Sequence, residues 1–145
     1  MKITIRKMHI EDLERINDLS HQLGYDLSLA ETKNQIEKIL STKDHIAYVM
    51  VLKEKVVGWI HAFVSLNIES KPFVEIGGLV VDEKYRGKGI GNKLVDKIKE
   101  WTIEMKISSL RVRSNVTRLS THEFYKKAGF EEIKEQKVFS LNTTE

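Results

Sequence analysis

Residues 73–105 read FVEIGGLVVDEKYRGKGIGNKLVDKIKEWTIEM, and this stretch decides the fold. Its first part, Phe73–Val81, is almost wholly apolar, as expected of a strand that is covered on both faces. A polar break and three glycines within five residues follow, where a helix has to begin. Apolar side chains then recur every three or four residues on one helix face: Ile90, Leu94, Ile98, Trp101 and Met105. The stretch therefore predicts a buried strand, a glycine turn and an amphipathic helix.

The glycine turn, Arg86–Asn92, has the properties of an anion-binding site. The first amides of a helix have no partner within the helix, and the helix dipole adds about half a positive charge there. Glycines let a phosphate approach the backbone closely. Basic residues gather around the same point, namely Lys84, Arg86, Lys88 and Lys93. The alternative is a solvated connection, but the glycine spacing, the basic cluster and the helix together favour phosphate binding.

Two nucleotide-binding patterns do not fit these residues. The P-loop pattern G-x-x-x-x-G-K-[ST] fails because the only Gly-Lys pair is Gly87-Lys88 and no glycine lies five residues before it. The dinucleotide pattern G-x-G-x-x-G fails because the glycines read G-x-G-x-G. That fold also places an acid after the next strand, where this chain has Asn115.

The stretch resembles the acetyl-CoA signature of the GNAT superfamily of N-acetyltransferases, R/Q-x-x-G-x-G/A, which Arg86, Gly89 and Gly91 meet. A later segment, His122–Phe130, reads HEFYKKAGF and is similar to that family's segment H-x-F-Y-x-x-x-G-F. The two motifs follow in the right order, with one helix and one strand expected between them. The resemblance covers nearly the whole chain and is weakest over the first forty or so residues, that is about a quarter of its length.

The composition is that of one globular domain. The 145 residues are enough to form a core without disulfides, and 41% are apolar and 31% charged. The net charge of +3 is too small to indicate nucleic acid as a partner. The absence of cysteine excludes thiol nucleophiles and Cys-ligated zinc, and it agrees with a cytoplasmic protein. We expect no membrane segment, because no apolar run approaches ~18 residues, and no metal, because the histidines have no ligand spacing.

The rest of the chain predicts further strands and helices. We expect strands over Lys2–Arg6, Ile46–Lys53, Val56–Leu66, Leu110–Arg113 and the region Phe130–Leu141, which can form a hairpin. We expect helices over Ile10–Gln22, Ser28–Leu40 and Arg118–Lys127. In the second of these helices, the side chains expected to face inward are Leu29, Ile36, Ile39 and Leu40.

This order of elements is α/β. It predicts a single domain, residues 1–145, with a central mixed and mostly antiparallel sheet, a parallel β-α-β crossover and flanking helices. The resemblance implies the same GNAT-like fold. Tyr25-Asp26, between the first two helices, is a hinge on the residues alone, whereas the resemblance implies a loop that lies over the acceptor.

The resemblance implies transfer of an acetyl group from acetyl-CoA directly to an amine. The pyrophosphate would bind the turn, at Arg86, Gly87, Lys88, Gly89, Ile90, Gly91 and Asn92, and the pantetheine would lie along Leu79, Val80 and Val81. The pair Gly77-Gly78 interrupts a bulky strand, which is typical of a bulge or of close packing. In the family an amide just beyond the bulge, here of Leu79 or Val81, faces the acetyl carbonyl and stabilises an oxyanion.

Two residues are candidates for the base that takes the proton of the amine. Glu75 is the one acid in its apolar strand, where partial desolvation would raise the pKa of its carboxyl group into a useful range. As a base, Glu75 would act directly or through water. The alternative is that its carboxylate pairs with a lysine such as Lys71. His61 is the second candidate because of its ordinary pKa, although a hydrogen-bonded strand histidine is the commoner role.

Tyr125 is the candidate acid, because the resemblance implies that its hydroxyl reaches the sulfur of CoA and protonates the thiolate. On the residues alone it is a core aromatic beside Phe124. Asn115 could hydrogen-bond the pantetheine or form an ordinary turn, and it lies farther from Tyr125 than in many relatives. His122 more commonly caps or packs than reacts.

The sequence therefore predicts an N-acetyltransferase that acts on a primary amine of a small molecule through a ternary complex. The alternative is a non-catalytic acyl-CoA-binding or regulatory module. Nucleic-acid binding through Lys84–Lys99 ranks lower, because that stretch lacks interleaved aromatics and contains acids. The identity of the acceptor and the choice among Glu75, His61 and a water chain stay open, as does the formation of a homodimer.

Overall fold

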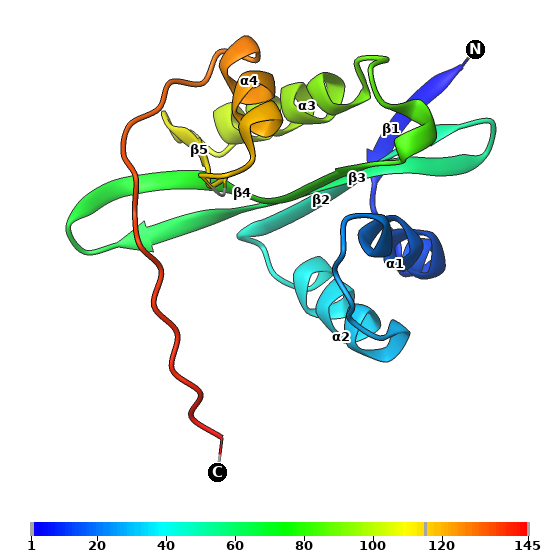
Figure 1. Cartoon of the computed structure of the whole chain (residues 1–145), viewed down its shortest axis with the longest axis horizontal. Coiled ribbons are helices and arrows are strands. Elements are labelled where there is room, and N and C mark those ends of the chain that lie inside the picture. Colours follow the sequence, from blue (N-terminus) through cyan, green and yellow to red (C-terminus); the bar gives the residue numbers. More distant parts are fainter. Residues whose placement is uncertain (1, 115, 145) are drawn as a thin grey trace. The chain divides into compact units, whose positions relative to one another are not determined.

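The computed structural model describes residues 2–114 and 116–144. Contacts divide the chain into two compact units, Met1–Arg113 and Ser114–Glu145. The first unit contains a sheet with helices on both of its faces (Figure 1). The second contains the helix α4 (Leu119–Lys127). The α/β class predicted from the sequence is confirmed.

The first unit is built on a five-stranded sheet in the order β1-β2-β3-β4-β5. Its strands are β1 (Ile3–Lys7), β2 (His45–Leu52), β3 (Lys55–Asn67), β4 (Ser70–Val81) and β5 (Leu110–Val112). Neighbours run antiparallel, except that β4 and β5 are parallel. The helix α3 (Ile90–Glu104) joins β4 to β5, so the predicted parallel crossover is also confirmed.

Helices cover the two faces of this sheet. The 3-10 turn η1 (Ile10–Asp12), α1 (Leu13–Gln22) and α2 (Leu29–Leu40) lie on one face, and α3 lies on the other (Figure 1). The start of α2 is fixed by a capping box, in which Ser28 Oγ accepts from the Glu31 amide at 3.1 Å and Glu31 Oε1 accepts from the Ser28 amide at 2.9 Å.

Each face has its own set of buried apolar side chains. Under α1 and α2 the cluster consists of Met8, Ile16, Leu19, Ile36, Ala47, Val49, Val56 and Val80. Under α3 the buried residues of the helix are Ile90, Leu94, Val95, Ile98, Trp101 and Thr102. Each fully buried large side chain stabilises the fold by about 1.5–3 kcal/mol, so the buried face of α3 holds this helix and its N-terminus in place.

Three predicted features of the helices differ from the structure. Leu29 and Leu40, expected to face inward, are 44% and 43% exposed, because they lie at the two ends of α2, beyond the region that covers the sheet. Met105, the last residue of the predicted apolar face of α3, is 37% exposed, because it caps the helix past its last buried turn. The predicted helix Ile10–Gln22 begins as the 3-10 turn η1, and α1 starts at Leu13.

In the second unit, the predicted helix Arg118–Lys127 is confirmed as α4. It ends where Gly129 adopts a φ of 101° and the Phe130 amide donates to the Tyr125 carbonyl at 3.0 Å. The predicted strand region Phe130–Leu141 is wrong, since the structure has no strand or helix over residues 130–144. A strand needs a partner for its backbone groups, and the spacing of apolar residues does not supply one.

Candidate active site

The fourth strand contains the bulge that the glycine pair predicts. Glu75 lies opposite Phe63 and Ile76 lies opposite Ala62, but His61 lies opposite Gly78. Gly77 is therefore the extra residue on β4. A bulge of this kind turns the strand and shifts which backbone groups face each edge.

The rings of β3 explain why both bulge positions are glycine. A Cβ atom on Gly77 would lie 2.7 Å from Nδ1 of His61, and one on Gly78 would lie 2.9 Å from Cη2 and Cζ3 of Trp59. Both distances are shorter than real Cβ contacts allow. Because Trp59 and His61 alternate with the side chains that face α3, both rings lie on the face covered by α1 and α2.

Beyond the bulge, β4 no longer has β5 as a neighbour. The two strands pair only over Val74–Ile76 and Leu110–Val112 among the described residues. The Val74 amide donates to Ser109 O at 3.0 Å, toward β5, and the Asp82 amide donates to Val57 O at 2.8 Å, toward β3. Alternation along the strand then directs the amides of Leu79 and Val81 to the open edge on the β5 side.

Val80, the third predicted contact on this strand, has a different orientation. Its side chain is 2% exposed and belongs to the core under α1 and α2. By the same alternation, its backbone amide faces β3. The open edge therefore presents the amides of Leu79 and Val81.

The glycine turn follows this open edge directly. After the 3-10 turn η2 (Glu83–Tyr85), Gly87 and Gly89 have φ angles of 78° and 80°, which favour glycine. Gly89 is the N-cap of α3, and the Lys93 amide makes the first bond within the helix, to Gly89 O at 3.1 Å. The amides of Ile90, Gly91 and Asn92 thus precede the first bond within the helix and have no acceptor there.

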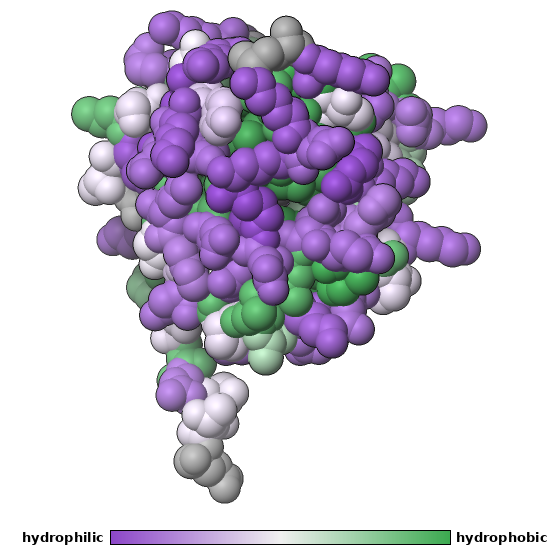
Figure 2. All heavy atoms as spheres, turned by 90° about the vertical axis from the view of Figure 1, so that its right-hand side faces the viewer, coloured by the Kyte–Doolittle hydropathy of each residue, from purple (hydrophilic) through white to green (hydrophobic). Residues whose placement is uncertain are grey.

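Positive side chains surround this helix start. Lys84, Arg86, Lys88 and Lys93 are exposed, and Arg86 also donates from Nε to Val81 O at 3.2 Å. The ammonium of Lys88 lies 5.6 Å from the centre of the Tyr85 ring. Figure 2 shows that the side of the molecule on which the turn and the β2–β3 hairpin lie is mostly hydrophilic. The site can therefore bind an anion on exposed amides and basic side chains.

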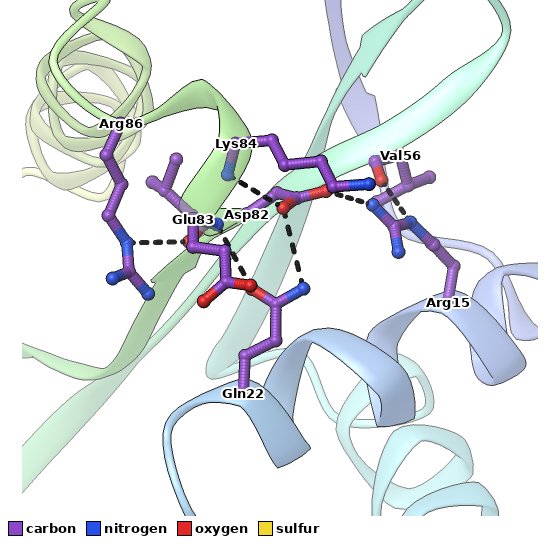
Figure 3. Close-up of polar contacts among 8 residues, drawn as sticks. Arg15, Gln22, Val56, Asp82, Glu83, Lys84 and Arg86 are labelled. Atoms are coloured by element: carbon purple, nitrogen blue, oxygen red, sulfur yellow. Dashed lines mark hydrogen bonds and ion pairs between the residues drawn. The ribbon is translucent and has the colours of Figure 1, made fainter.

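An ion pair holds the residue between β4 and the turn. The carboxylate of Asp82 is 3% exposed and pairs with the guanidinium of Arg15 from α1 (Figure 3). Burial by itself would raise the pKa of this carboxyl group. Hydrogen bonds from the Lys84 amide, Arg15 and Gln22 outweigh burial, so the pKa lies below its ordinary value and Asp82 is ionised at neutral pH.

Glu75 lies on the face covered by α1 and α2, because it pairs directly across the sheet with Phe63. Its side chain is 15% exposed, and Oε1 accepts from Nε of Arg113 at 3.1 Å. The partner of Glu75 is therefore Arg113 from the end of β5 and not Lys71. Arg111, two residues earlier, places its guanidinium 4.0 Å from the centre of the Phe73 ring.

His61 lies on the same face and has a partner that the sequence does not indicate. Nε2 of His61 lies 2.8 Å from Nδ1 of His45 on β2, and Phe63 stacks on both rings. Burial is the main cause that lowers the pKa of His61 to about 4, and the nearby charge of His45 lowers it further. At neutral pH, His61 is therefore a neutral imidazole whose Nδ1 lies beside Gly77.

The remaining candidates come from other segments of the chain. Tyr125 is in α4 of the second unit, half-buried, with its ring edge-on to Phe124 and Phe130 at 5.1 and 5.5 Å between centroids. His122 is also in α4 and half-buried. Asn115 lies outside the described residues. Tyr25, between α1 and α2, is 56% exposed.

Sequence reasoning missed His45, Arg15 and Asp82. Their partners are 16 residues away for His45 and 67 residues away for the Arg15–Asp82 pair. No local pattern connects such positions. The sequence contains two weak signals for them. Asp82 is a polar residue at the end of a buried strand, and His45 is a histidine at the start of another.

Comparisons with known proteins identify the family and the fold of this chain. Residues 10–130 match the model of the Acetyltransferase (GNAT) family. An uncharacterized N-acetyltransferase of Methanocaldococcus jannaschii is 30% identical over 138 residues, which are 89% of this chain and 61% of that protein. A streptothricin acetyltransferase of Escherichia coli is 25% identical over 111 residues, which are 74% of this chain and 62% of that protein.

Solved structures match the fold over nearly its whole length. The aminoglycoside N-acetyltransferase AAC(6')-Iy, in complex with a bisubstrate analogue of CoA, has a TM-score of 0.88 at 18% identity and covers 98% of this chain and 99% of its own. Glucosamine-6-phosphate N-acetyltransferase of Arabidopsis thaliana has a TM-score of 0.82 at 22% identity and covers 98% of this chain and 100% of its own. At these identities the likeness concerns the fold.

The chain spans between 31% and 62% of the length of the first three relatives that it matches in sequence. Within residues 2–114 and 116–144, no helix has both the length and the apolar content that a membrane crossing needs.

Proposed function

We propose that this chain, which belongs to the GNAT acetyltransferase family, is an N-acetyltransferase that moves the acetyl group of acetyl-CoA to a primary amine of a small molecule. The observation that carries the proposal is the bulge at Gly77, after which β4 leaves β5 and leads into the glycine turn. The reaction proceeds through a ternary complex, which needs no covalent enzyme intermediate and no cysteine. Residues 1–145 act as one N-acetyltransferase domain.

The turn Arg86–Asn92 binds the pyrophosphate of the cofactor. Support comes from the free amides of Ile90, Gly91 and Asn92, from the positive φ angles of Gly87 and Gly89, and from the exposed basic side chains of Arg86 and Lys88. A phosphate at a helix N-terminus is stabilised by both the amides and the helix dipole.

The pantetheine arm pairs with the open edge of β4 along Leu79–Val81, with Asn115 as a further contact. The thioester then lies beside the bulge, where the amide of Leu79 donates to the acetyl oxygen as negative charge develops on it. Support comes from the direction of the Leu79 and Val81 amides. A donor that is already fixed in the strand needs little reorganisation during the reaction.

Glu75 takes the proton of the acceptor ammonium, directly or through water. Its support is its position two residues before the bulge, on the face covered by α1 and α2, with its side chain only 15% exposed. His61 is the second candidate. Its support is the neutral ring with Nδ1 beside Gly77 and a hydrogen-bonded partner, His45, that can share the proton.

Tyr125 donates a proton to the departing thiolate. Its support is the motif HEFYKKAGF, in which it holds the tyrosine position, and the matched pKa values of a phenol, ~10, and a thiol, ~8.5. The ammonium loses two protons overall. One passes through the base to water and the other ends on the thiol, as the C–N bond forms and the C–S bond breaks.

A small-molecule amine is the proposed acceptor because the named relatives include acetyltransferases of streptothricin, aminoglycosides and glucosamine 6-phosphate. Protein N-termini are the second class, because N-alpha-acetyltransferase 30 of Xenopus laevis is 26% identical over 94% of this chain. A non-catalytic acyl-CoA-binding module is the alternative to both.

Thermal unfolding with acetyl-CoA, CoA, ATP and NADH in parallel is the first test. A ligand at a hundred times its Kd stabilises a protein by about 2.7 kcal/mol, which corresponds to several degrees in a domain of this size. We expect a shift with acetyl-CoA and CoA only. No shift with either would contradict the proposal.

Thiol release is the second test, with neamine, streptothricin, glucosamine 6-phosphate and a peptide with a free N-terminus as acceptors. Turnover of one of the three small amines supports the proposal, and turnover of the peptide alone moves the acceptor to proteins. Binding of acetyl-CoA without turnover of any of them favours the non-catalytic module.

A further inference from the structure

The helix α1 contacts the connection between β4 and α3 at two positions on the same side. Arg15 and Gln22 are seven residues apart, which is two helical turns, so both side chains point toward this connection (Figure 3). The guanidinium of Arg15 pairs with Asp82. Gln22 contacts Asp82 Oδ1 through Nε2 at 3.5 Å and accepts the Glu83 amide through Oε1 at 3.1 Å.

Asp82 is the centre of these contacts. Its carboxylate also accepts the Lys84 amide at 3.1 Å, and its own amide donates to Val57 O at 2.8 Å. Arg15 in turn donates from Nε to Val56 O at 2.7 Å. Three elements therefore meet at one buried carboxylate, namely α1, the start of β3 and the turn η2.

Besides this anchor, the contacts of the glycine turn are the bond from Arg86 Nε to Val81 O at 3.2 Å and the approach of the Lys88 ammonium to the centre of the Tyr85 ring at 5.6 Å. Apart from their neighbours in the chain, no atom lies within 4 Å of where a Cβ on Gly87 or Gly89 would be, so this side of both residues is open. Glycine also has the largest conformational freedom to lose on ordering. The turn is fixed at its two ends, by Asp82–Lys84 on one side and by the buried face of α3 on the other.

The positive charge of Arg15 also affects the electrostatic potential at the glycine turn. Asp82 is a buried anion four residues before Arg86, the first residue of the proposed phosphate site. An uncompensated carboxylate there would repel the phosphates, and burial leaves little water to screen it. Arg15 neutralises that charge from the side of α1.

We propose that Arg15, Gln22 and Asp82 are positioning residues that hold residues 83–89 in the conformation that binds the phosphates of CoA, without contacting the phosphates themselves. This inference rests on the proposed function, because it deepens the account of the same site. According to this inference, the affinity for CoA depends on α1, which lies on the sheet face opposite to α3. Since Gln22 is the last residue of α1, the same contact also fixes where the segment 23–28 begins.

The test compares CoA binding by isothermal titration calorimetry in wild type, Gln22→Ala, Arg15→Gln and Arg15→Lys. Arg6→Gln is the matched control, because Arg6 forms a comparable pair with Asp12, at 2.8 Å, between β1 and η1. We expect Gln22→Ala and Arg15→Gln to weaken CoA binding about tenfold. Arg15→Lys, which keeps the charge, recovers part of the loss, and Arg6→Gln stays within about twofold of wild type.

Amide hydrogen exchange of the ligand-free proteins is the second readout. Exchange of residues 83–92 should be faster in Gln22→Ala and Arg15→Gln than in wild type, and unchanged in Arg6→Gln. Wild-type CoA affinity together with wild-type exchange in both α1 variants would overturn the inference. An equal loss of affinity in Arg6→Gln would overturn it too, because the effect would then be general destabilisation. Failure of wild type to bind CoA would instead contradict the proposed function.

Discussion

Nδ1 of His45 lies 2.8 Å from Nε2 of His61, and the two rings stack with 5.1 Å between their centroids. One nitrogen of this contact has to donate and the other has to accept, so the pair holds one proton between the rings. If both rings were fully protonated, two N–H groups would face each other. The contact therefore disfavours protonation of both rings, and burial, which lowers the pKa of His61, makes the ring next to the bulge at Gly77 the neutral one.

The stability of the protein should fall between pH 6.5 and pH 4. His61 has a pKa of about 4 in the folded state, so the unfolded chain, with a histidine pKa of 6.5, binds more protons in this interval. The loss for this group is on the order of 3 kcal/mol, and it is complete below the folded pKa. Urea unfolding at several pH values measures it. The slope of the free energy of unfolding against pH should become smaller in His61→Gln. It should not change in His21→Gln, which replaces an exposed histidine of α1.

Gly77→Ala should destabilise the protein by about 1–3 kcal/mol. The new Cβ would lie 2.7 Å from Nδ1 of His61, and contacts with His45 and Phe63 restrain that ring from moving away. The double variant Gly77→Ala/His61→Ala should lose less stability than the sum of the losses in the two single variants, because the clash between the new Cβ and the ring is gone. Strict additivity in urea unfolding would contradict this explanation of the glycine.

Gly89→Glu should abolish the stabilisation of the protein by CoA. Gly89 has a φ of 80°, and the substitution adds both backbone strain and a negative charge at the start of α3. Gly24→Glu is the matched control, because Gly24 has a φ of 89° and also has no atom within 4 Å of a Cβ. Both variants should lose about 1 kcal/mol of stability. Only Gly89→Glu should lose the thermal shift, and a similar loss in Gly24→Glu would assign the effect to strain.

Glu75→Gln should lower kcat by about a hundredfold while the KM for acetyl-CoA stays close to that of wild type. The amide keeps the size of the side chain and removes its ability to take a proton. Arg113→Gln is the companion variant, because it removes the partner of Glu75 at 3.1 Å and leaves the carboxylate in place. Steady-state kinetics decide the assignment. A larger loss in His61→Gln than in Glu75→Gln would transfer the role of the base to His61.

Tyr125→Phe should lower kcat by about ten- to a hundredfold and leave the affinity for CoA unchanged. The substitution keeps the aromatic contacts with Phe124 and Phe130 and removes only the hydroxyl group. Calorimetric titration with CoA checks the binding, and thiol release checks the turnover. Unchanged turnover would exclude Tyr125 as the acid.

Local sequence was sufficient for much of this protein. The spacing of Ile90, Leu94 and Ile98 predicts the helix that the structure contains from Ile90, because a helix repeats every 3.6 residues whatever it packs against. The glycine pair predicts the bulge for a similar reason, since a missing side chain marks the point where rings approach the backbone. The glycine turn and its order after an apolar strand likewise predict the crossover, whereas the phosphate site at this turn stays a prediction.

Tertiary structure alone decided which side chains pair with one another. Glu75 pairs with Arg113, 38 residues later, although Lys71 is nearer in sequence, because the parallel register of β4 and β5 brings the end of β5 to that carboxylate. His45 meets His61 through the register of β2 and β3, and Arg15 meets Asp82 across 67 residues. The strand expected at Phe130–Leu141 did not form, since a strand exists only where another backbone pairs with it. Helices and turns follow from neighbours in sequence, whereas strands and ion pairs depend on neighbours in space.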